Sequence, residues 1–383
     1  MKNFLPKQYL KDSRFKVKHN YLKEQFHDYK KILKEIETVI KKSDFTLGSK
    51  VDLFENRISK LLKSKYVVAV GSGTDALLLS LKALGVKEGD EVITTPYTFY
   101  ATIGAIVTSG AKPVFVDVKN DYNINEDLIK KAITKKTKVI LPVHWAGRVC
   151  EMNKINKIAK QYKLHVVEDS CHAILGKYNG KLAGTFGTFG CFSMHPLKNL
   201  NIWGDGGFVI CSSYRNYKKM RLLRNHGLVG RDKNLIFGYN SRLDTVQAVV
   251  ALNAMKKIKK ITSRRIENAK YLDKQFEDCD KIFLPKRERY IKEVYHLYHL
   301  KLESKKKRDQ IIKKLISKKI DAKIHYPTSM HLQPASKIYG YKKGDFLVSE
   351  NLSDTSLSLP VHEFITKKDL YKISKIILNE VKK

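Results

Sequence analysis

Short apolar segments alternate with amphipathic helical segments between residues 66 and 211, and this alternation limits the possible folds more than any other feature. Most of the predicted strands are separated by helical segments, such as DALLLSL after the first strand. In chain order the predicted strands are YVVAV, DEVITTP, KPVFVDV, TKVILPVH, HVVEDS, GCFSM and GGFVICS. Strands that alternate with helices form mostly parallel sheets covered by helices on both faces. The sequence therefore predicts an α/β fold.

The pattern changes beyond residue 262. A long helical segment, the alternating strand VYHLYHLKL and a basic helix over 304–318 follow one another there. We therefore expect a large α/β domain over residues 1–262 and a smaller C-terminal α+β domain over residues 263–383. Within the large domain, apolar residues at helical spacing predict an N-terminal helix over 21–40.

Cysteine content and hydropathy indicate a soluble protein of the cytoplasm. The 5 cysteines form no C-x-x-C pair and no zinc-type spacing, so we expect neither disulfides nor a metal site. The N-terminus MKNFLPKQYLKDSRFK lacks the apolar core of a signal peptide. No stretch approaches the roughly 18 consecutive apolar residues that span a bilayer, so we expect no membrane partner.

The formal net charge of +36 raises the alternative of a nucleic-acid-binding protein. The basic residues are spread along the whole chain, with Asp and Glu among them. Tracts such as YKKILKEIETVIKK keep apolar residues at helical spacing, which is typical of solvated helix faces. Because the sequence has no finger, basic zipper or RNP-like motif, we expect no nucleic-acid partner, only a mild attraction for anionic substrates.

Three motifs fall at the carboxyl ends of predicted strands, where open α/β sheets bind ligands. GSGT precedes a helix whose first N–H groups favour a phosphate, although it can equally be only an N-cap. Glu168 and Asp169 end a strand, where a carboxylate can serve a ligand or cap the next helix. Lys198 lies in the apolar loop HPLKNLNIW. Such a loop suits either a surface position or a lysine that reacts as a free amine with a carbonyl.

A phosphate cradle, a carboxylate at a strand end and a pocketed lysine are together the three fixed points of pyridoxal 5'-phosphate (PLP). Over nearly its whole length the chain resembles the DegT–StrS family of PLP-dependent nucleotide-sugar aminotransferases, which have the fold-type I architecture. The motifs that carry the resemblance, in order, include VAVGSGTDALLLSL, YTFYATIGAI, VVEDSCHA, GTFGCFSMHPLKNL, GDGG, RNHG, GYNSRLDTVQA and HYPTSMHLQPA.

The resemblance implies roles around the cofactor ring. Lys198 matches the Schiff-base lysine, and Asp169 matches the partner of the pyridinium nitrogen. His172 stands where the family has Gln or His near the phenolic oxygen, and Phe99 matches the aromatic residue that stacks on the ring. Phe99 can also be plain core packing, and His172 a hydrogen-bonded core histidine.

The resemblance also implies a phosphate site completed by a second subunit. The positions that match the family's phosphate-binding residues are Gly73, Thr74, Ser193 and Asn240. Asn240 corresponds to an asparagine that reaches the site of the neighbouring subunit, which implies a homodimer with shared active sites. Four positions depart from the usual pattern and are expected to border the sugar pocket: Trp145, Val149, His195 and Trp203.

The implied activity is transfer of an amino group from an amino acid, with L-glutamate as the expected donor, to a keto group of a nucleotide-linked deoxysugar. The aminated sugar would serve a surface polysaccharide or a glycosylated metabolite. Two alternatives within the family are a dehydratase, which replaces the lysine with histidine, and a catalytically idle member, which would lose Lys198 or Asp169. This chain keeps both residues, which argues against both alternatives.

Overall fold

The computed structural model describes residues 15–19 and 21–382. Its centre is a seven-stranded sheet with the order β1-β9-β8-β5-β4-β2-β3. The strands are β1 (Tyr66–Val70), β2 (Glu91–Thr94), β3 (Lys112–Phe115), β4 (Thr137–Ile140), β5 (His165–Asp169), β8 (Phe189–Ser193) and β9 (Gly207–Cys211). Only β9 is antiparallel to its neighbours, and every pair from β8 to β3 is parallel. The prediction of an α/β fold on a mostly parallel sheet is confirmed.

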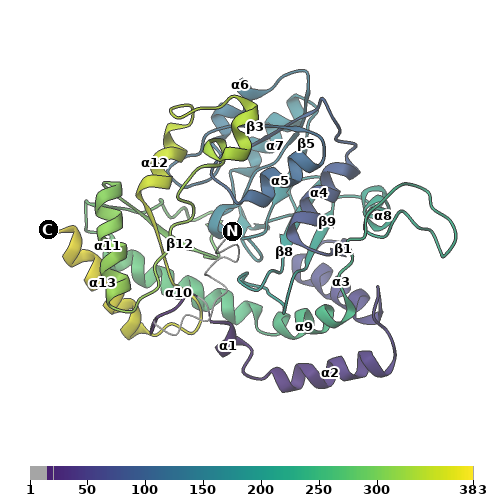
Figure 1. Ribbon diagram of the computed structural model, residues 1–383, viewed down its shortest axis with the longest axis horizontal. Coiled ribbons are helices and arrows are strands. Elements are labelled where there is room, and N and C mark those ends of the chain that lie inside the picture. Colours follow the sequence, from purple (N-terminus) through teal and green to yellow (C-terminus); the bar gives the residue numbers. More distant parts are fainter. Residues whose placement is uncertain (1–14, 20, 383) are drawn as a thin grey trace.

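Helices cover both faces of this sheet (Figure 1). Side chains of a strand point alternately to its two faces. In β1, Val68 and Val70 therefore pack in one core, with α4 (Gly73–Ala83), α5 (Tyr100–Thr108) and α8 (Tyr214–Leu223). Val67 and Ala69 pack in the opposite core, with α2 (Tyr29–Lys41), α3 (Ser49–Leu62) and α9 (Thr245–Met255). Helix α7 (Met152–Gln161) covers β4 and β5 in a further core, and the short α6 (Ile129–Ala132) lies in the connection that precedes β4.

The C-terminal part has its own core around the three-stranded antiparallel sheet β10-β12-β13, on the left in Figure 1. Its elements are α10 (Ile258–Phe276), β10 (Ile282–Phe283), β12 (Tyr298–Leu302), α11 (Lys305–Ser317), α12 (Leu347–Thr355), β13 (Ser356–Leu359) and α13 (Lys367–Val381). The predicted boundary after residue 262 lies inside α10. Ile258 packs in the core beside α9, whereas Leu272 and Phe276 pack in the C-terminal core. The division into two domains stays a prediction.

A third, small sheet connects the two parts of the chain. Strand β11 (Ile291–Lys292) pairs with β6 (Lys177–Tyr178), which pairs with β7 (Lys181–Leu182). Short 3-10 helices in the described part of the chain lie in connections, at Glu126–Leu128, Trp145–Gly147, Met330–Leu332 and Pro334–Tyr339. Among the helices of residues 15–19 and 21–382, none is long and apolar enough to cross a membrane.

The prediction of one N-terminal helix over 21–40 is wrong. The segment forms two helices, α1 (Leu22–Gln25) and α2 (Tyr29–Lys41), with a break between them. The break lets the two helices meet different partners. Gln25 and Phe26 contact the loop between β8 and β9, whereas α2 packs along α9 at the lower edge of Figure 1.

Candidate active site

The site is built where the carboxyl ends of β5 and β8 meet the first turns of α4 and α5. Asp169 ends β5 and pairs in register with Cys191 of β8, and Ser193 ends β8. Gly73 begins α4 directly against Ser193, because a Cβ atom at Gly73 would lie 2.5 Å from the Ser193 Cβ. A side chain at position 73 would therefore displace the end of β8. Two of the predicted phosphate-binding residues are thus in contact.

Asp169 is held in one orientation by hydrogen bonds to both of its oxygens. The carboxylate is 6% exposed. Its Oδ2 accepts from Thr102 Oγ1 at 2.9 Å, and its Oδ1 accepts from the Cys171 N–H at 3.2 Å. Because Thr102 donates its only hydroxyl proton to Asp169, it must accept from Thr98 Oγ1, 2.7 Å away. Thr102 was not identified from the sequence, although it follows Phe99 by three residues, which is the spacing of neighbours on a helix face.

The neighbouring Glu168 has a structural role. Its four hydrogen bonds come from the backbone N–H groups of Gly184, Phe186 and Gly187, at 2.7–2.8 Å, and from His144 Nε2 at 2.9 Å. His144 Nδ1 accepts from the Cys150 N–H, so Nε2 carries the ring proton and donates to Glu168. The strand-end motif alone left both carboxylates open for either role, and the family resemblance indicated Asp169. The structure assigns Glu168 to anchoring the loop before β8 and leaves Asp169 at the site.

Lys198 lies in the loop that joins β8 to the antiparallel β9. Burial lowers the pKa of Lys198 from its usual value, and the nearby Cys171 and Asp169 offset part of this effect. No salt bridge joins Lys198 to any residue in the described part of the chain, so the Asp169 carboxylate favours its protonated form only from a distance, and less than burial disfavours it. The lowered pKa increases the share of Lys198 that is an unprotonated, nucleophilic amine relative to an exposed lysine.

His172 and Trp145 place polar atoms without partners beside Lys198. Their rings lie 5.4 Å apart, and His172 also contacts the ring of His296 at 4.2 Å. Burial, followed by the charge of Lys198, lowers the pKa of His172 well below its usual value, so the imidazole is neutral. Several buried polar atoms of the described residues lack a hydrogen-bond partner, and three of them lie at this site: His172 Nδ1, Trp145 Nε1 and Ser170 Oγ. Such atoms indicate a polar ligand, because an unpaired buried polar group is costly.

An aromatic group borders the opposite side of the site. Phe99 precedes α5 and is 46% exposed, so its side chain is accessible to a ligand. Its ring centroid lies 5.9 Å from that of Tyr326, which lies 5.5 Å from that of Trp145. Burial raises the pKa of Tyr326, and the neighbouring Tyr100 and Asp169 add to this effect. The motif HYPTSM contains Tyr326, but sequence reasoning gave it no role.

The first turn of α4 has free N–H groups for an anion. Ser72 caps the helix by accepting from the Asp75 N–H at 3.0 Å. The N–H groups of Gly73 and Thr74 come before the first intrahelical bond and have no partner within the helix. Thr74 is exposed. Helix starts of this kind bind phosphate through these groups and the helix dipole.

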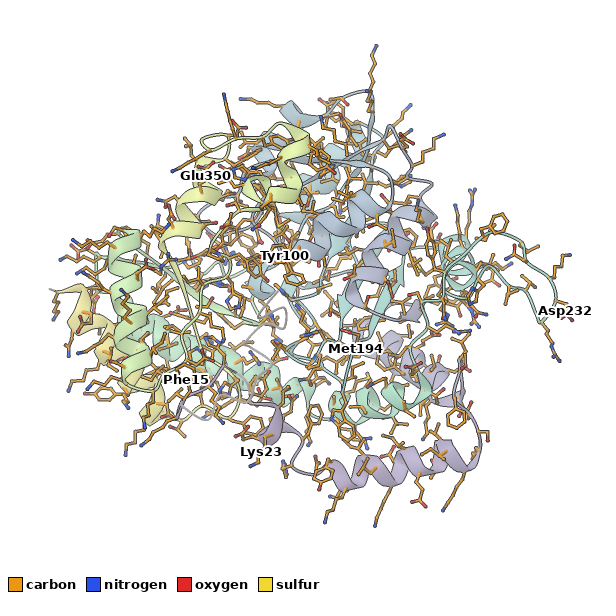
Figure 2. The ribbon with its side chains drawn as sticks, viewed as in Figure 1. Phe15, Lys23, Tyr100, Met194, Asp232 and Glu350 are labelled. Carbon is orange, nitrogen blue, oxygen red and sulfur yellow. The ribbon has the colours of Figure 1, made fainter. Side chains whose placement is uncertain are left out.

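Asn240 is exposed, and its backbone pairs with that of Asn225 at the base of the 225–240 loop. This loop projects from the molecule with Asp232 near its tip, at the right of Figure 2, whereas Met194 and Tyr100 lie near the centre. Phe237, on the same loop, is 97% exposed. The structure therefore places Asn240 on an outward segment with an unusually exposed apolar side chain.

The residues that depart from the family pattern lie in different surroundings. Trp145 contacts His172 and Tyr326, and its position beside the sugar pocket stays a prediction. Val149 is fully buried in the core beneath α7, and Trp203 packs on Phe26 of the N-terminal segment at 5.7 Å. The expectation that Val149 and Trp203 border the sugar pocket is therefore not supported by their contacts.

Comparison with known proteins gives matches over most of the chain. The family model described as the DegT/DnrJ/EryC1/StrS aminotransferase family matches residues 27–378. A protein from Geobacillus stearothermophilus, named a pleiotropic regulatory protein, is 37% identical over 360 residues, 93% of this chain and 96% of that protein. The UDP-N-acetyl-3-dehydro-alpha-D-glucosamine 3-aminotransferase of Acidithiobacillus ferrooxidans is 34% identical over 348 residues, 90% of this chain and 92% of that enzyme.

The fold is also similar to a solved structure. The crystal structure of DesV from S. venezuelae, in complex with a ketimine intermediate, superimposes with a TM-score of 0.92 and 30% sequence identity. The superposition covers 96% of this chain and 99% of DesV. The similarity therefore includes the C-terminal part as well as the central sheet.

Proposed function

The chain belongs to the DegT/DnrJ/EryC1/StrS family of PLP-dependent sugar aminotransferases, and from this premise we propose a specific reaction for its site. It moves an amino group from L-glutamate to a keto group of a nucleotide-linked deoxysugar. The observation that carries this proposal is the amine of Lys198, with a lowered pKa, beside the fixed carboxylate of Asp169. The product enters a surface polysaccharide or a glycosylated metabolite.

The residues of the site fit PLP. Lys198 would hold the aldehyde carbon, Asp169 the ring nitrogen and Phe99 one face of the ring. The phosphate would lie between the first turn of α4 and the end of β8, at Gly73, Thr74 and Ser193. The unpaired His172 Nδ1 supports this fit, because a bound polar group would satisfy it. When bound, PLP supplies the electron sink that stabilises the negative charge left on the donor's Cα.

The residues of the site have different roles in the reaction. The unprotonated Nζ of Lys198 accepts the proton that leaves the donor's Cα, as a general base, and returns it as a general acid. The Asp169 carboxylate, held by Thr102 and the Cys171 N–H, keeps a negative charge where the ring nitrogen needs its proton. The neutral His172 offers a hydrogen bond without adding a positive charge beside Lys198.

The cysteines support a reducing compartment, and we infer the cytoplasm. All 5 cysteines of the sequence are free thiols in the structure: Cys150, Cys171, Cys191, Cys211 and Cys279. Free thiols persist where glutathione and thioredoxin keep them reduced.

Reductive trapping tests the proposed function directly. The protein is incubated with PLP, treated with borohydride and digested, and the labelled peptide is identified by mass spectrometry. We expect the label on Lys198, followed by turnover of glutamate with members of a panel of keto-sugar nucleotides. A label on another lysine, or none, would falsify the assignment of the amine.

Asp169→Asn is expected to lower kcat by roughly 10³-fold, about 4 kcal/mol at 1.4 kcal/mol per decade. The amide keeps the shape and can still accept from Thr102, but it lacks the negative charge that the ring nitrogen needs. Steady-state kinetics at saturating substrates measure the loss. Asp205→Asn, in the loop before β9, is the matched control and should keep near-normal kcat. Near-normal turnover by Asp169→Asn would show that another group does this work.

We propose that the active enzyme is a homodimer in which Asn240 completes the partner's phosphate site. The exposure of Asn240 and of Phe237 on the projecting loop supports this arrangement. Asn240→Ala and Lys198→Ala, each nearly inactive alone, should then complement one another after subunit exchange. The mixed dimer has one site with both an intact lysine and an intact partner asparagine.

Activity of the exchanged mixture should rise towards half that of the wild type, less the share of homodimers that remain. The exchange itself is checked with subunits of different tags. If exchange is demonstrated and activity does not recover, Asn240 serves its own chain or lies outside the site.

A further inference from the structure

The loop that carries Lys198 is fixed by a contact from the opposite end of the chain. We propose that Gln25, in α1, is a positioning residue for Lys198, a role that rests on Lys198 being the reacting amine. Gln25 is separated from the site residues in sequence and belongs to none of the motifs that carry the family resemblance. Its hydrogen-bond partner in the loop is Asn201, whose side chain in turn bonds the loop on the other side of Lys198.

Gln25 and Asn201 form a reciprocal pair of amide hydrogen bonds. Gln25 Nε2 donates to Asn201 Oδ1 at 2.8 Å, and Asn201 Nδ2 donates to Gln25 Oε1 at 2.8 Å. Gln25 is 4% exposed and Asn201 is 0% exposed. Buried polar pairs of this kind are expensive to break, because each amide then lacks a partner.

The second N–H of Asn201 closes the loop around Lys198. Asn201 Nδ2 also donates to the Pro196 carbonyl at 2.6 Å. Because a proline carbonyl can only accept, this bond fixes which end of the Asn201 amide carries the protons. It therefore also fixes the orientation of the Gln25 amide. Pro196 and Asn201 flank Lys198. The Asn201 side chain, which Gln25 orients, therefore joins the two ends of the short segment that carries the amine.

Other side-chain hydrogen bonds also hold this loop, apart from the closure from Pro196 to Asn201. Gln247 Nε2 donates to the Trp203 carbonyl at 3.0 Å, and Asn199 Nδ2 donates to the Val294 carbonyl at 3.1 Å. These bonds fix the exit of the loop and one side chain, but not the closure from Pro196 to Asn201. The contribution of Gln25 is therefore distinct from theirs.

The same N-terminal segment (residues 15–19 and 21–28) is tied to the C-terminal part of the chain. Val17 forms a backbone bridge with Ile320, and the Lys18 carbonyl bonds His362 Nε2 at 2.8 Å. Tyr21 stacks on the ring of His362 at 4.6 Å. Gln25 follows Tyr21 by one helical turn, so the segment connects the C-terminal core to the lysine loop.

The test uses the pH dependence of the reactivity of Lys198 in the full-length chain without cofactor. Trace acylation across a pH series, read by mass spectrometry, gives the inflection at which the Lys198 amine loses its proton. In the wild type we expect this inflection below that of exposed lysines in the same sample. In Gln25→Met the closure is lost and water reaches the amine, so the inflection should move up towards that of the exposed lysines.

A second readout separates positioning from general stability. In the holoenzyme, Gln25→Met should lower kcat roughly 10- to 100-fold with little change in KM, as expected when a reacting group is misplaced by about 1 Å. Asp28→Asn is the matched control, because it breaks the 2.9 Å pair with Lys257 on the same segment without touching the loop. It should change neither the inflection nor kcat.

If Gln25→Met does not fold, Gln25→Asn keeps the amide but is one methylene too short for both bonds, and the same upward shift is expected. An inflection that stays at the wild-type pH in a folded variant overturns the proposal. The proposed function fails separately, because it is refuted only when borohydride does not label Lys198 of the wild type.

Discussion

Lys198→Met is expected to abolish transamination and to make the cofactor-free protein more stable. The activity should fall by roughly 10⁴-fold or more, because the general base and the point of covalent attachment are lost together. The stability should rise because the folded chain no longer has to bury an amine. Burial lowers the pKa of Lys198, which shows that the folded site disfavours its charged form.

The stability difference between Lys198→Met and the wild type should depend on pH in a definite direction. Below the lowered pKa of Lys198 the folded protein must carry the ammonium at a cost, and the unfolded chain does not. Between the folded pKa and the unfolded value near 10.5, the unfolded chain binds more protons, so wild-type stability rises with pH. The advantage of Lys198→Met should therefore be largest near pH 7 and shrink as the pH approaches 10.

Urea denaturation of the cofactor-free proteins at pH 7 and pH 9.5 measures this difference. Lys82→Met is the matched control, because Lys82 is also partly buried but donates to the Ser109 carbonyl at 2.9 Å. That variant should lose a hydrogen bond, become slightly less stable and keep its activity. A Lys198→Met protein that is less stable than the wild type at pH 7 would contradict the account of a strained, desolvated amine.

The strands could be predicted from the sequence because each is short, apolar and bounded by turn residues. The predicted strand YVVAV coincides with β1, and the loop carrying Lys198 does join two adjacent strands, β8 and β9. The N-terminal helix could not be predicted correctly. Its apolar spacing continues from 21 to 40, but the break follows from contacts of Gln25 and Phe26 with a loop far along the chain.

Only the site residues that belong to sequence motifs could be predicted from the sequence. Lys198, Asp169 and Gly73 stand at strand ends and helix starts, where a sequence pattern indicates a ligand. The strand-end motif alone left Glu168 and Asp169 open, and the family resemblance selected Asp169. The structure adds a physical reason, because two adjacent residues of a strand point to opposite faces. The 184–187 loop and His144 donate four hydrogen bonds to Glu168 on one face, and Thr102 donates to Asp169 on the other.

Residues that support the site from outside its motifs cannot be identified from the sequence around them. Thr102 is one threonine among several, and Gln25 is one polar residue on an amphipathic helix. Their roles depend on partners that the fold brings from other segments, Asp169 and Asn201 respectively. Such contacts become visible only when the burial of both partners is known.

A group of buried histidines should make the protein unfold at mildly acidic pH. His172 and His296 lie ring against ring at 4.2 Å, and His299 and His325 both hydrogen-bond the Ser358 hydroxyl, at 2.8 and 2.9 Å. His19 bonds the Ser358 carbonyl at 3.3 Å. Burial lowers the pKa of His19 and His325 to about 3 and that of His362 to about 4.

Burial also lowers the pKa of the other three histidines well below 6.5: His172, His296 and His299. Positive charges that face the group act in the same direction. They are Lys198, Lys323, Arg265 and Arg287. The folded protein therefore keeps all six rings neutral at a pH where the unfolded chain protonates them.

The resulting loss of stability has a definite pH window. Above pH 6.5 the rings are neutral in both states, and the stability is fully present. Below pH 6.5 the unfolded chain binds more protons, and each histidine costs up to about 1.4 kcal/mol per pH unit until its folded pKa is reached. Six such groups together cost up to about 8 kcal/mol per pH unit, against a typical total stability of about 5–15 kcal/mol. Carboxylates with lowered pKa values act only below about pH 4.5, and the raised pKa of Glu363 offsets at most one histidine above it. The window between 4.5 and 6.5 therefore reports mainly the histidines.

We therefore expect the midpoint of urea denaturation to fall steeply from pH 7.0 to pH 5.5, and the protein to unfold without denaturant near pH 5. The slope of stability with pH counts the protons taken up on unfolding. His296→Phe, which removes one member of the ring pair, should reduce this count by about one. His27→Gln changes an exposed histidine that bonds only the neighbouring Glu24 carbonyl, and should leave the slope unchanged. A stability that is flat between pH 7.0 and pH 5.5 would mean that the folded site accommodates imidazolium. The neutral His172 assumed beside Lys198 would then be wrong as well.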